Sequence, residues 1–185
     1  MKRTLTIIYL VVLFYGPLAA EVSYNANITN IINVTYNGTG AASVVIASNL
    51  QSYVTATVDG GAVSIVQNNT VSASTCGEII YQLTGASTNG AFSLEGNYKA
   101  TIELHGLSLT NPNGPAVNIL NGKRIEIKPI EGTISTLTDG TSTVEDAWKA
   151  ALYCKGHIEC KGKGTLNVYG NYDHAFCSME YMSIK

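Results

Sequence analysis

The sequence predicts an all-β protein whose C-terminal part winds into a right-handed parallel β-helix with coils of about 24–25 residues. Three observations predict this fold. Only 13% of the 185 residues are charged. Short alternating strands, rich in β-branched residues, are separated by glycine and asparagine turns, as is typical of all-β proteins. Segments in the second half of the chain also resemble one another in a fixed order.

The first twenty residues have the pattern of a secretory signal peptide. Met1–Arg3 is basic, Leu5–Tyr15 is apolar, and Leu18–Ala20 supplies small residues before Glu21. We therefore expect residues 1–20 to be removed on export, and the protein to be secreted, periplasmic or held at the cell surface. Because the apolar run is shorter than the ~20 residues of a spanning helix, we expect no membrane span.

The rest of the chain divides into two regions. Residues 21–75 contain strand-like runs at Ser43–Ala47, Tyr53–Val58 and Val63–Val66, but no evident repeat. This region is either a cap over the open end of the core or a set of degenerate early coils. Residues 76–185 form the predicted β-helix.

Four alanines, Ala91, Ala116, Ala151 and Ala175, open the repeating segments, which begin 25, 35 and 24 residues apart. The longer step contains an insertion at about 139–149. We expect the four alanines to stack in one inward-facing column, because small side chains fit where a coil is tight.

Each alanine is followed by a strand, a polar turn and a second strand that carries two apolar positions. These pairs are Ala100/Ile102, Ile125/Ile127, Ile158/Cys160 and Met182/Ile184. In the first three segments a glycine then precedes a third strand, at Gly106, Gly132 and Gly164. Three short strands per unit at this period indicate a β-solenoid. A β-sandwich would explain the strands, but not this recurring order.

The last residue, Lys185, comes directly after a core pair, in the middle of a coil. We therefore expect either further coils or domains beyond Lys185 or a second subunit that covers this end. The four cysteines form no CxxC pair, which argues against zinc, and their pairing is left open.

A series of short motifs in this region resembles a known family. The motifs are TLTDG at 136–140, Glu145-Asp146, AALY at 150–153, GKGTLNV at 162–168 and GNYDH at 170–174. In this order, within about 77–185, they resemble a family of secreted carbohydrate-binding β-helix proteins found largely in bacteria. The resemblance implies a right-handed parallel β-helix similar to polysaccharide lyases. It also implies binding of acidic plant polysaccharide, such as polygalacturonate, with calcium.

The chain departs from the family pattern where coils often carry paired carboxylates, since those positions read Gly156-His157 and Glu180-Tyr181. Calcium is bound by six to eight oxygens, many of them carboxylate. The predicted calcium ligands are Asp139, Glu145, Asp146, Asp173 and Glu180. The alternative is that these acids belong to ordinary turns and loops.

Trp148, Lys149, Tyr172 and His174 form the predicted carbohydrate-binding patch. Trp148 and Lys149 lie in the insertion, and insertions in solenoids are often on the binding face. An aromatic ring can pack against the apolar side of a sugar ring. In the alternative interpretation Trp148 covers the edge of the core and the tyrosines stack as ladders.

These observations favour a binder of acidic or cell-wall polysaccharide, assisted by calcium, over an enzyme. One alternative is a polysaccharide lyase, which needs calcium and a base such as Lys155, Lys161 or Lys163. Another is a structural surface protein or adhesin stalk. No Lys/Arg run appears, so a nucleic-acid partner is not expected.

Overall fold

The computed structural model describes residues 21–26, 29–68, 77–142 and 149–185. Over these residues the protein is all-β, with one short 3₁₀ turn at Ser48–Leu50. The strands form two sheets that contain both parallel and antiparallel pairs and do not close into a barrel. Within the same ranges no helix is long and apolar enough to cross a membrane.

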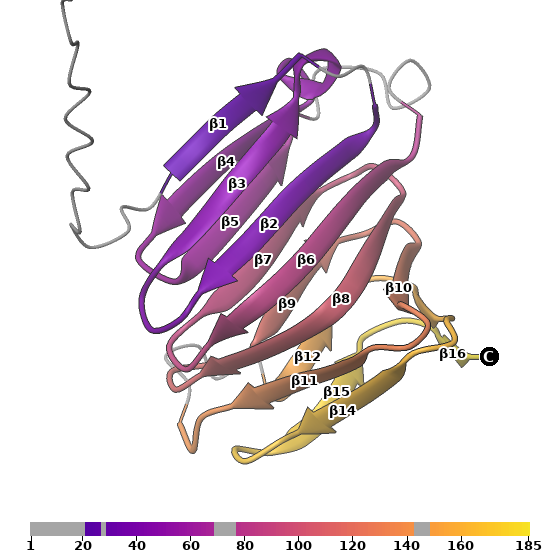
Figure 1. Ribbon diagram of the computed structural model, residues 1–185. Helices are drawn as coiled ribbons and strands as arrows, with labels where there is room; N and C mark the ends of the chain where they lie inside the picture. Colours follow the sequence, from indigo (N-terminus) through magenta and orange to yellow (C-terminus); the bar gives the residue numbers. More distant parts are fainter. Residues whose placement is uncertain (1–20, 27–28, 69–76, 143–148) are drawn as a thin grey trace, which may run out of the picture.

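The two sheets lie as two layers, and the chain progresses from one end of the molecule to the other (Figure 1). The larger sheet contains β1 (Glu21–Asn25), β2 (Ile31–Asn37), β3 (Ala42–Ala47), β6 (Ile79–Ser87), β8 (Ala100–Asn111), β10 (Ile125–Pro129), β11 (Ile134–Asp139), β13 (Ile158–Cys160), β14 (Thr165–Tyr169) and β16 (Met182–Ile184). The smaller sheet contains β4 (Val54–Asp59), β5 (Ala62–Gln67), β7 (Ala91–Gly96), β9 (Val117–Asn121), β12 (Ala150–Cys154) and β15 (His174–Ser178).

Strands from successive segments pair in parallel and in register. β8, β10, β13 and β16 are neighbours in the larger sheet, and β7, β9, β12 and β15 are neighbours in the smaller one. The four apolar pairs noted in the sequence stand directly opposite one another, because Ile125 pairs with both Ala100 and Ile158, and Ile158 with Met182. The side chains of the first two pairs and of Ile158 belong to one hydrophobic core, Cys160 and Met182 pack partly buried against it, and Ile184 is 73% exposed.

The prediction that the four alanines stack in one inward-facing column is wrong. In β7 the core side is occupied by Phe92 and Leu94, which are fully buried, so Ala91 lies on the opposite face of the strand. Ala151 is buried outside the core cluster, and Ala175 is exposed. Of the four alanines only Ala116 joins the core. The period-2 alternation of a strand explains the error, since moving by one residue exchanges the two faces.

In the first repeating segment, the expected glycine break between the second and the third strand is also absent. β8 runs through Gly106 without interruption, although its pairing with β6 shifts register near Gly85. Both glycines have positive φ, 68° and 87°, a conformation that other residues rarely adopt. A Cβ on Gly85 would lie 2.1 Å from the carbonyl oxygen of Tyr36. Glycine here bends a continuous strand.

The N-terminal strands continue both sheets and then reverse. β2 pairs in parallel with β6, and β5 in parallel with β7, as in the later segments. β3 and β4 instead pair antiparallel with β2 and β5. The strand-like runs expected in this region correspond to β3, β4 and β5, and every end lies within one residue of its expected position. The region thus combines coil-like stacking with antiparallel hairpins.

Three cysteines, Cys154, Cys160 and Cys177, are free thiols, and Cys76 lies outside the described residues. Burial raises the pKa of both the Cys154 and the Cys160 thiol to about 11. The thiolate is the reactive form, so these two residues behave as small core hydrophobes.

A buried polar cluster lies at one corner between the sheets. The amide nitrogen of Asn121 donates to the side-chain oxygen of Gln67 and to the carbonyl of Tyr98, both at 2.8 Å. The same Gln67 oxygen accepts from the Tyr98 backbone N–H at 2.7 Å, and its nitrogen donates to the Tyr81 hydroxyl. Gln67 and Asn121 are almost wholly buried. Unpaired polar groups here would be costly, so this cluster fixes the turn between segments.

We expect Asn121→Ala to destabilise the protein by about 1–3 kcal/mol, because it leaves the Tyr98 carbonyl and the Lys123 N–H without the Asn121 partner. Urea unfolding measures the change. Asn113→Ala, in an exposed loop, is the matched control and should change stability by less than about 0.5 kcal/mol. Equal losses in the two variants would contradict the structural role of Asn121.

Candidate functional site

Charged residues gather in two rows on the outer face of the larger sheet, where β8, β10, β13 and β16 are neighbours. In a parallel sheet, residues in register point to the same side. The first row is Thr101, Glu126 and Glu159. The second row lies two residues later on each strand and, from β8 to β16, consists of Glu103, Lys128, Lys161 and Lys185.

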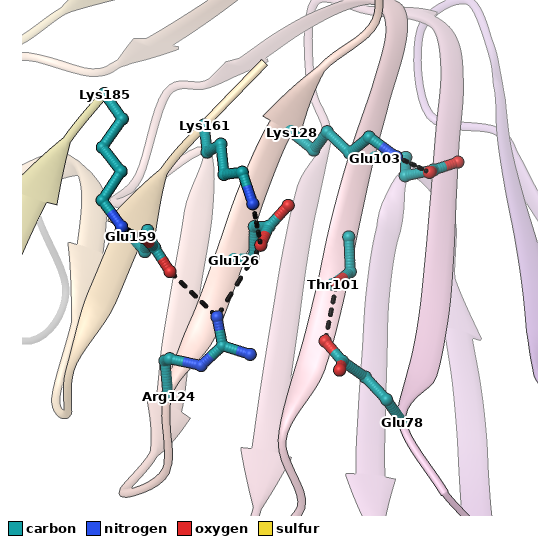
Figure 2. A network of polar contacts seen from close by, with 9 residues as sticks. All are labelled: Glu78, Thr101, Glu103, Arg124, Glu126, Lys128, Glu159, Lys161 and Lys185. Carbon is teal, nitrogen blue, oxygen red and sulfur yellow. Dashed lines mark hydrogen bonds and ion pairs between the residues drawn. The ribbon is translucent and has the colours of Figure 1, made fainter.

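The last three members of the second row form what we term the lysine row, Lys128, Lys161 and Lys185. The register continues past the strand ends because the Lys161 N–H donates to the Ile127 carbonyl at 2.9 Å and the Lys185 N–H to the Cys160 carbonyl at 3.0 Å. The three lysines therefore lie side by side on adjacent segments (Figure 2).

Arg124 relieves a repulsion between two stacked carboxylates. Glu126 and Glu159 are direct neighbours in the first row, and like charges in that relation destabilise a sheet. The Arg124 guanidinium lies 2.9 Å from Glu159 and 3.7 Å from Glu126, so it bridges the two (Figure 2).

Each member of the lysine row is directed toward a carboxylate. Lys128 donates to Glu103 at 2.9 Å, Lys161 lies 4.0 Å from Glu126, and Lys185 contacts Glu159. The three glutamate side chains are only 10–14% exposed, whereas the lysine side chains are 43–61% exposed. The carboxylates thus form an inner layer and the ammonium groups an outer, solvent-facing one.

Ion pairs shift the pKa values of Glu103, Glu159 and their lysine partners. Burial alone would raise the pKa of Glu103, but hydrogen bonds from Lys128, Gln82 and His105 together hold that pKa below its ordinary value. Hydrogen bonds from Lys185 and Arg124 lower the pKa of Glu159. In return, Glu103 raises the pKa of Lys128, and Glu159 that of Lys185. At neutral pH Lys128 and Lys185 are therefore cationic.

A groove of about 540 Å³ opens beside the lysine row, within the size range of ligand sites. Its lining residues are Glu126, Lys128, Pro129, Ile130, Glu131, Lys161, Gly162, Lys163 and Lys185. Four lysines and two glutamates line it, so its side chains carry an excess of positive charge. Pro129 and Ile130 add an apolar part. The groove combines apolar contact area with convergent hydrogen-bond donors, as a site for an anionic and partly apolar ligand requires.

The predicted carbohydrate patch is brought together in part. The His174 N–H donates to the Lys149 carbonyl at 3.0 Å, at the start of the paired strands β12 and β15. Tyr172 lies two residues before His174 and is 37% exposed. Trp148 lies outside the described residues. The patch stays a prediction, because nothing in the described structure tests whether it binds sugar.

The predicted calcium ligands are not all at one edge. The Asp139 carboxylate accepts from the Asn171 N–H, and the Asn171 amide donates back to the Asp139 carbonyl at 2.8 Å. Asp139 is 3% exposed, so it fastens the turn after β14, close to Asp173. Glu180 lies between β15 and β16, at the other end of β15 from Asp173.

Glu145 and Asp146 lie outside the described residues. Among the residues described, no group of three His, Cys, Asp or Glu side chains is placed to hold a metal ion. Asp139 also has one carboxylate oxygen engaged by Asn171. Calcium at this edge stays a prediction that depends on Asp173 and on the two acids of the insertion.

The predictions made from the sequence do not include most residues of the charged face. Lys161 was noted as a potential base, but Lys128, Lys185 and the glutamates beneath them were not. A signal was present, since the second strands read Ile-Glu-Ile-Lys at 125–128 and Ile-Glu-Cys-Lys at 158–161. The repeated alternation of acid and base indicates two rows once the strands are known to stack in register.

Comparisons with known proteins identify the family. A family model described as "carbohydrate-binding domain-containing protein" matches residues 60–185, more than half of the chain. The chain belongs to this family. The match begins within the β4–β5 hairpin and includes the whole charged face. A search of curated proteins found no match.

Among solved structures, the carbohydrate-binding chain is similar to a polysaccharide lyase-like protein from C. thermocellum, determined as a gadolinium derivative. The TM-score is 0.67 at 17% sequence identity, and the match covers 83% of this chain. It covers 58% of that chain, so this protein spans little more than half of that protein's length. At this identity the likeness concerns the fold alone.

We expect Glu103→Gln to lower stability at neutral pH by about 1 kcal/mol, because it removes the ionic partner of Lys128. A carboxylate whose folded pKa is depressed stabilises the fold above its unfolded pKa, near 4.3, and loses that contribution as pH falls through the folded pKa. The difference in melting temperature between the two proteins should therefore vanish in strong acid. Glu95→Gln, on an exposed position of β7, should follow the unmodified protein throughout. A difference that persists in acid would contradict the ionic role.

Proposed function

We propose that this protein binds acidic polysaccharide, of the polyuronate kind, on its charged face, and does so as a binder rather than as a lyase. The observation that carries the proposal is the groove in which four lysines surround Pro129 and Ile130. Membership of a carbohydrate-binding family supports the ligand class. A carboxylated sugar offers an anion that can pair with the excess lysines and a ring face that can contact the apolar part of the groove.

The fold proposed for this function is a right-handed parallel β-helix. The support is the parallel, in-register pairing of β7, β9, β12 and β15 in one sheet and of β8, β10, β13 and β16 in the other. Crossover connections between parallel strands are right-handed in the great majority of proteins. Export through a signal peptide at residues 1–20 is proposed with it, since a cell-wall polymer is met outside the cytoplasm.

The groove is tested by a charge reversal at its rim. Lys163 is 78% exposed and contacts Glu131 at 3.6 Å, so Lys163→Glu should leave the fold intact. We expect it to lower retention in affinity electrophoresis through polygalacturonate by roughly three- to tenfold. Lys155→Glu makes the same charge change in an exposed turn at the other end of β13 and is the matched control.

Retention of the unmodified protein by polygalacturonate but not by a neutral polymer supports the proposal. No retention of folded protein in any gel would overturn it. Formation of unsaturated sugar products, seen by ultraviolet absorbance, would establish the lyase instead. Folding without any glycan binding would favour the structural stalk.

Calcium assistance is a separate proposal for the edge near Asp173. We expect calcium to increase retention, and Asp173→Asn to remove only that increase, because the side chain is 41% exposed and directly precedes β15, which pairs with the strand that follows the insertion. Asp59→Asn, at the exposed end of β4, is the control. Equal retention with calcium and with chelator would contradict this part.

A further inference from the structure

The lysine row presents one cation per segment along a straight line across the strands. Adjacent strands lie about 4.8 Å apart, so Lys128 and Lys185 are separated by roughly 10 Å with Lys161 between them. All three ammonium groups are on the solvent side of the glutamates that they contact. The face therefore offers a periodic set of donors rather than a single charged point.

Stacking three cations is costly to the sheet itself. Like charges that face each other on neighbouring strands repel, and Arg124 relieves this only for the glutamates. Each ammonium carries three donors, and the ion pairs with Glu103, Glu126 and Glu159 engage them from one side. The outer side of the row is suited to further carboxylates.

The glutamates also place the lysine heads before any ligand arrives. Lys128 is held by Glu103 at 2.9 Å, and Lys185 by Glu159. Ordering a free lysine side chain costs binding energy, and a side chain that is already ordered avoids most of that cost. The inner carboxylates thus act as positioning groups for the outer ammonium groups.

We propose that the lysine row binds successive carboxylates of a polyuronate chain directly, without a bridging divalent cation, with the sugar chain running across the strands. This rests on the proposed function and specifies its ligand as a polymer with a carboxylate on every sugar. Ile130, which is partly exposed, would contact the sugar rings while Lys161 and Lys185 pair with carboxylates.

Direct pairing is favoured over a calcium bridge by the charges on this face. A dication would approach three ammonium groups, and the glutamate oxygens beneath them are engaged by Lys128, Arg124 and Lys185. Calcium needs six to eight oxygen ligands. The lysine row supplies no oxygen ligand. An ammonium group and a carboxylate form a charge-assisted hydrogen bond without a bridging cation.

The experiment is calorimetric titration of the protein with mono-, di-, tri- and tetragalacturonate, in chelator and at two salt concentrations. We expect affinity to rise with each sugar up to three and little beyond, to persist in chelator, and to fall with salt. Lys161→Gln and Lys185→Gln should each weaken trigalacturonate binding roughly three- to tenfold. Lys155→Gln should leave it unchanged, and methyl-esterified trigalacturonate should not bind the row.

Two results would overturn the inference while leaving acidic-polysaccharide binding itself intact: polygalacturonate binding that Lys161→Gln and Lys185→Gln do not alter, or binding that chelator abolishes. The absence of binding to any polyuronate, with or without calcium, would overturn both. Circular dichroism of each variant, compared with the unmodified protein, separates lost binding from lost folding.

Discussion

Parallel, in-register pairing of strands from successive segments is the constraint on which the rest of this structure depends. The backbone hydrogen bonds of each segment are completed by the next, so equivalent positions come to lie beside one another. Apolar positions such as Ile125 and Ile158 are therefore direct neighbours and form continuous columns inside the protein. The same rule acts on the outer face, where polar side chains are stacked on polar side chains of the next segment.

Stacking in register brings like charges together, and the sequence offsets their repulsion by placing Glu126 and Glu159 in one row and the lysine row beside it. A row that contains Glu126 and Glu159 would repel itself, and so would a row of lysines. Placing the rows two residues apart lets Glu126 meet Lys161 and Glu159 meet Lys185, and Arg124 joins the two glutamates. Exposed pairs of this kind stabilise the fold little. Their main effect is geometric, since they hold a line of cations at the surface.

That line connects the fold to carbohydrate binding. A polymer with a regular charge is best matched by a surface with a regular charge, and a sheet stacked in register provides one. The groove beside the row adds apolar contacts from Pro129 and Ile130. The edge with Lys149, Tyr172 and His174 lies on the other sheet, so it is a second surface, distinct from the charged face.

The sequence by itself determined the all-β class, most strand positions and which apolar pairs are equivalent, because alternation and glycine turns are local properties. It did not determine which face Ala91 occupies, since one residue of register exchanges the two sides. It also did not determine the lysine row or the Asp139–Asn171 contact. Their members lie 24 to 33 residues apart along the chain. Only the stacking of one segment on the next brings such residues within reach of one another, and that is a property of the tertiary structure.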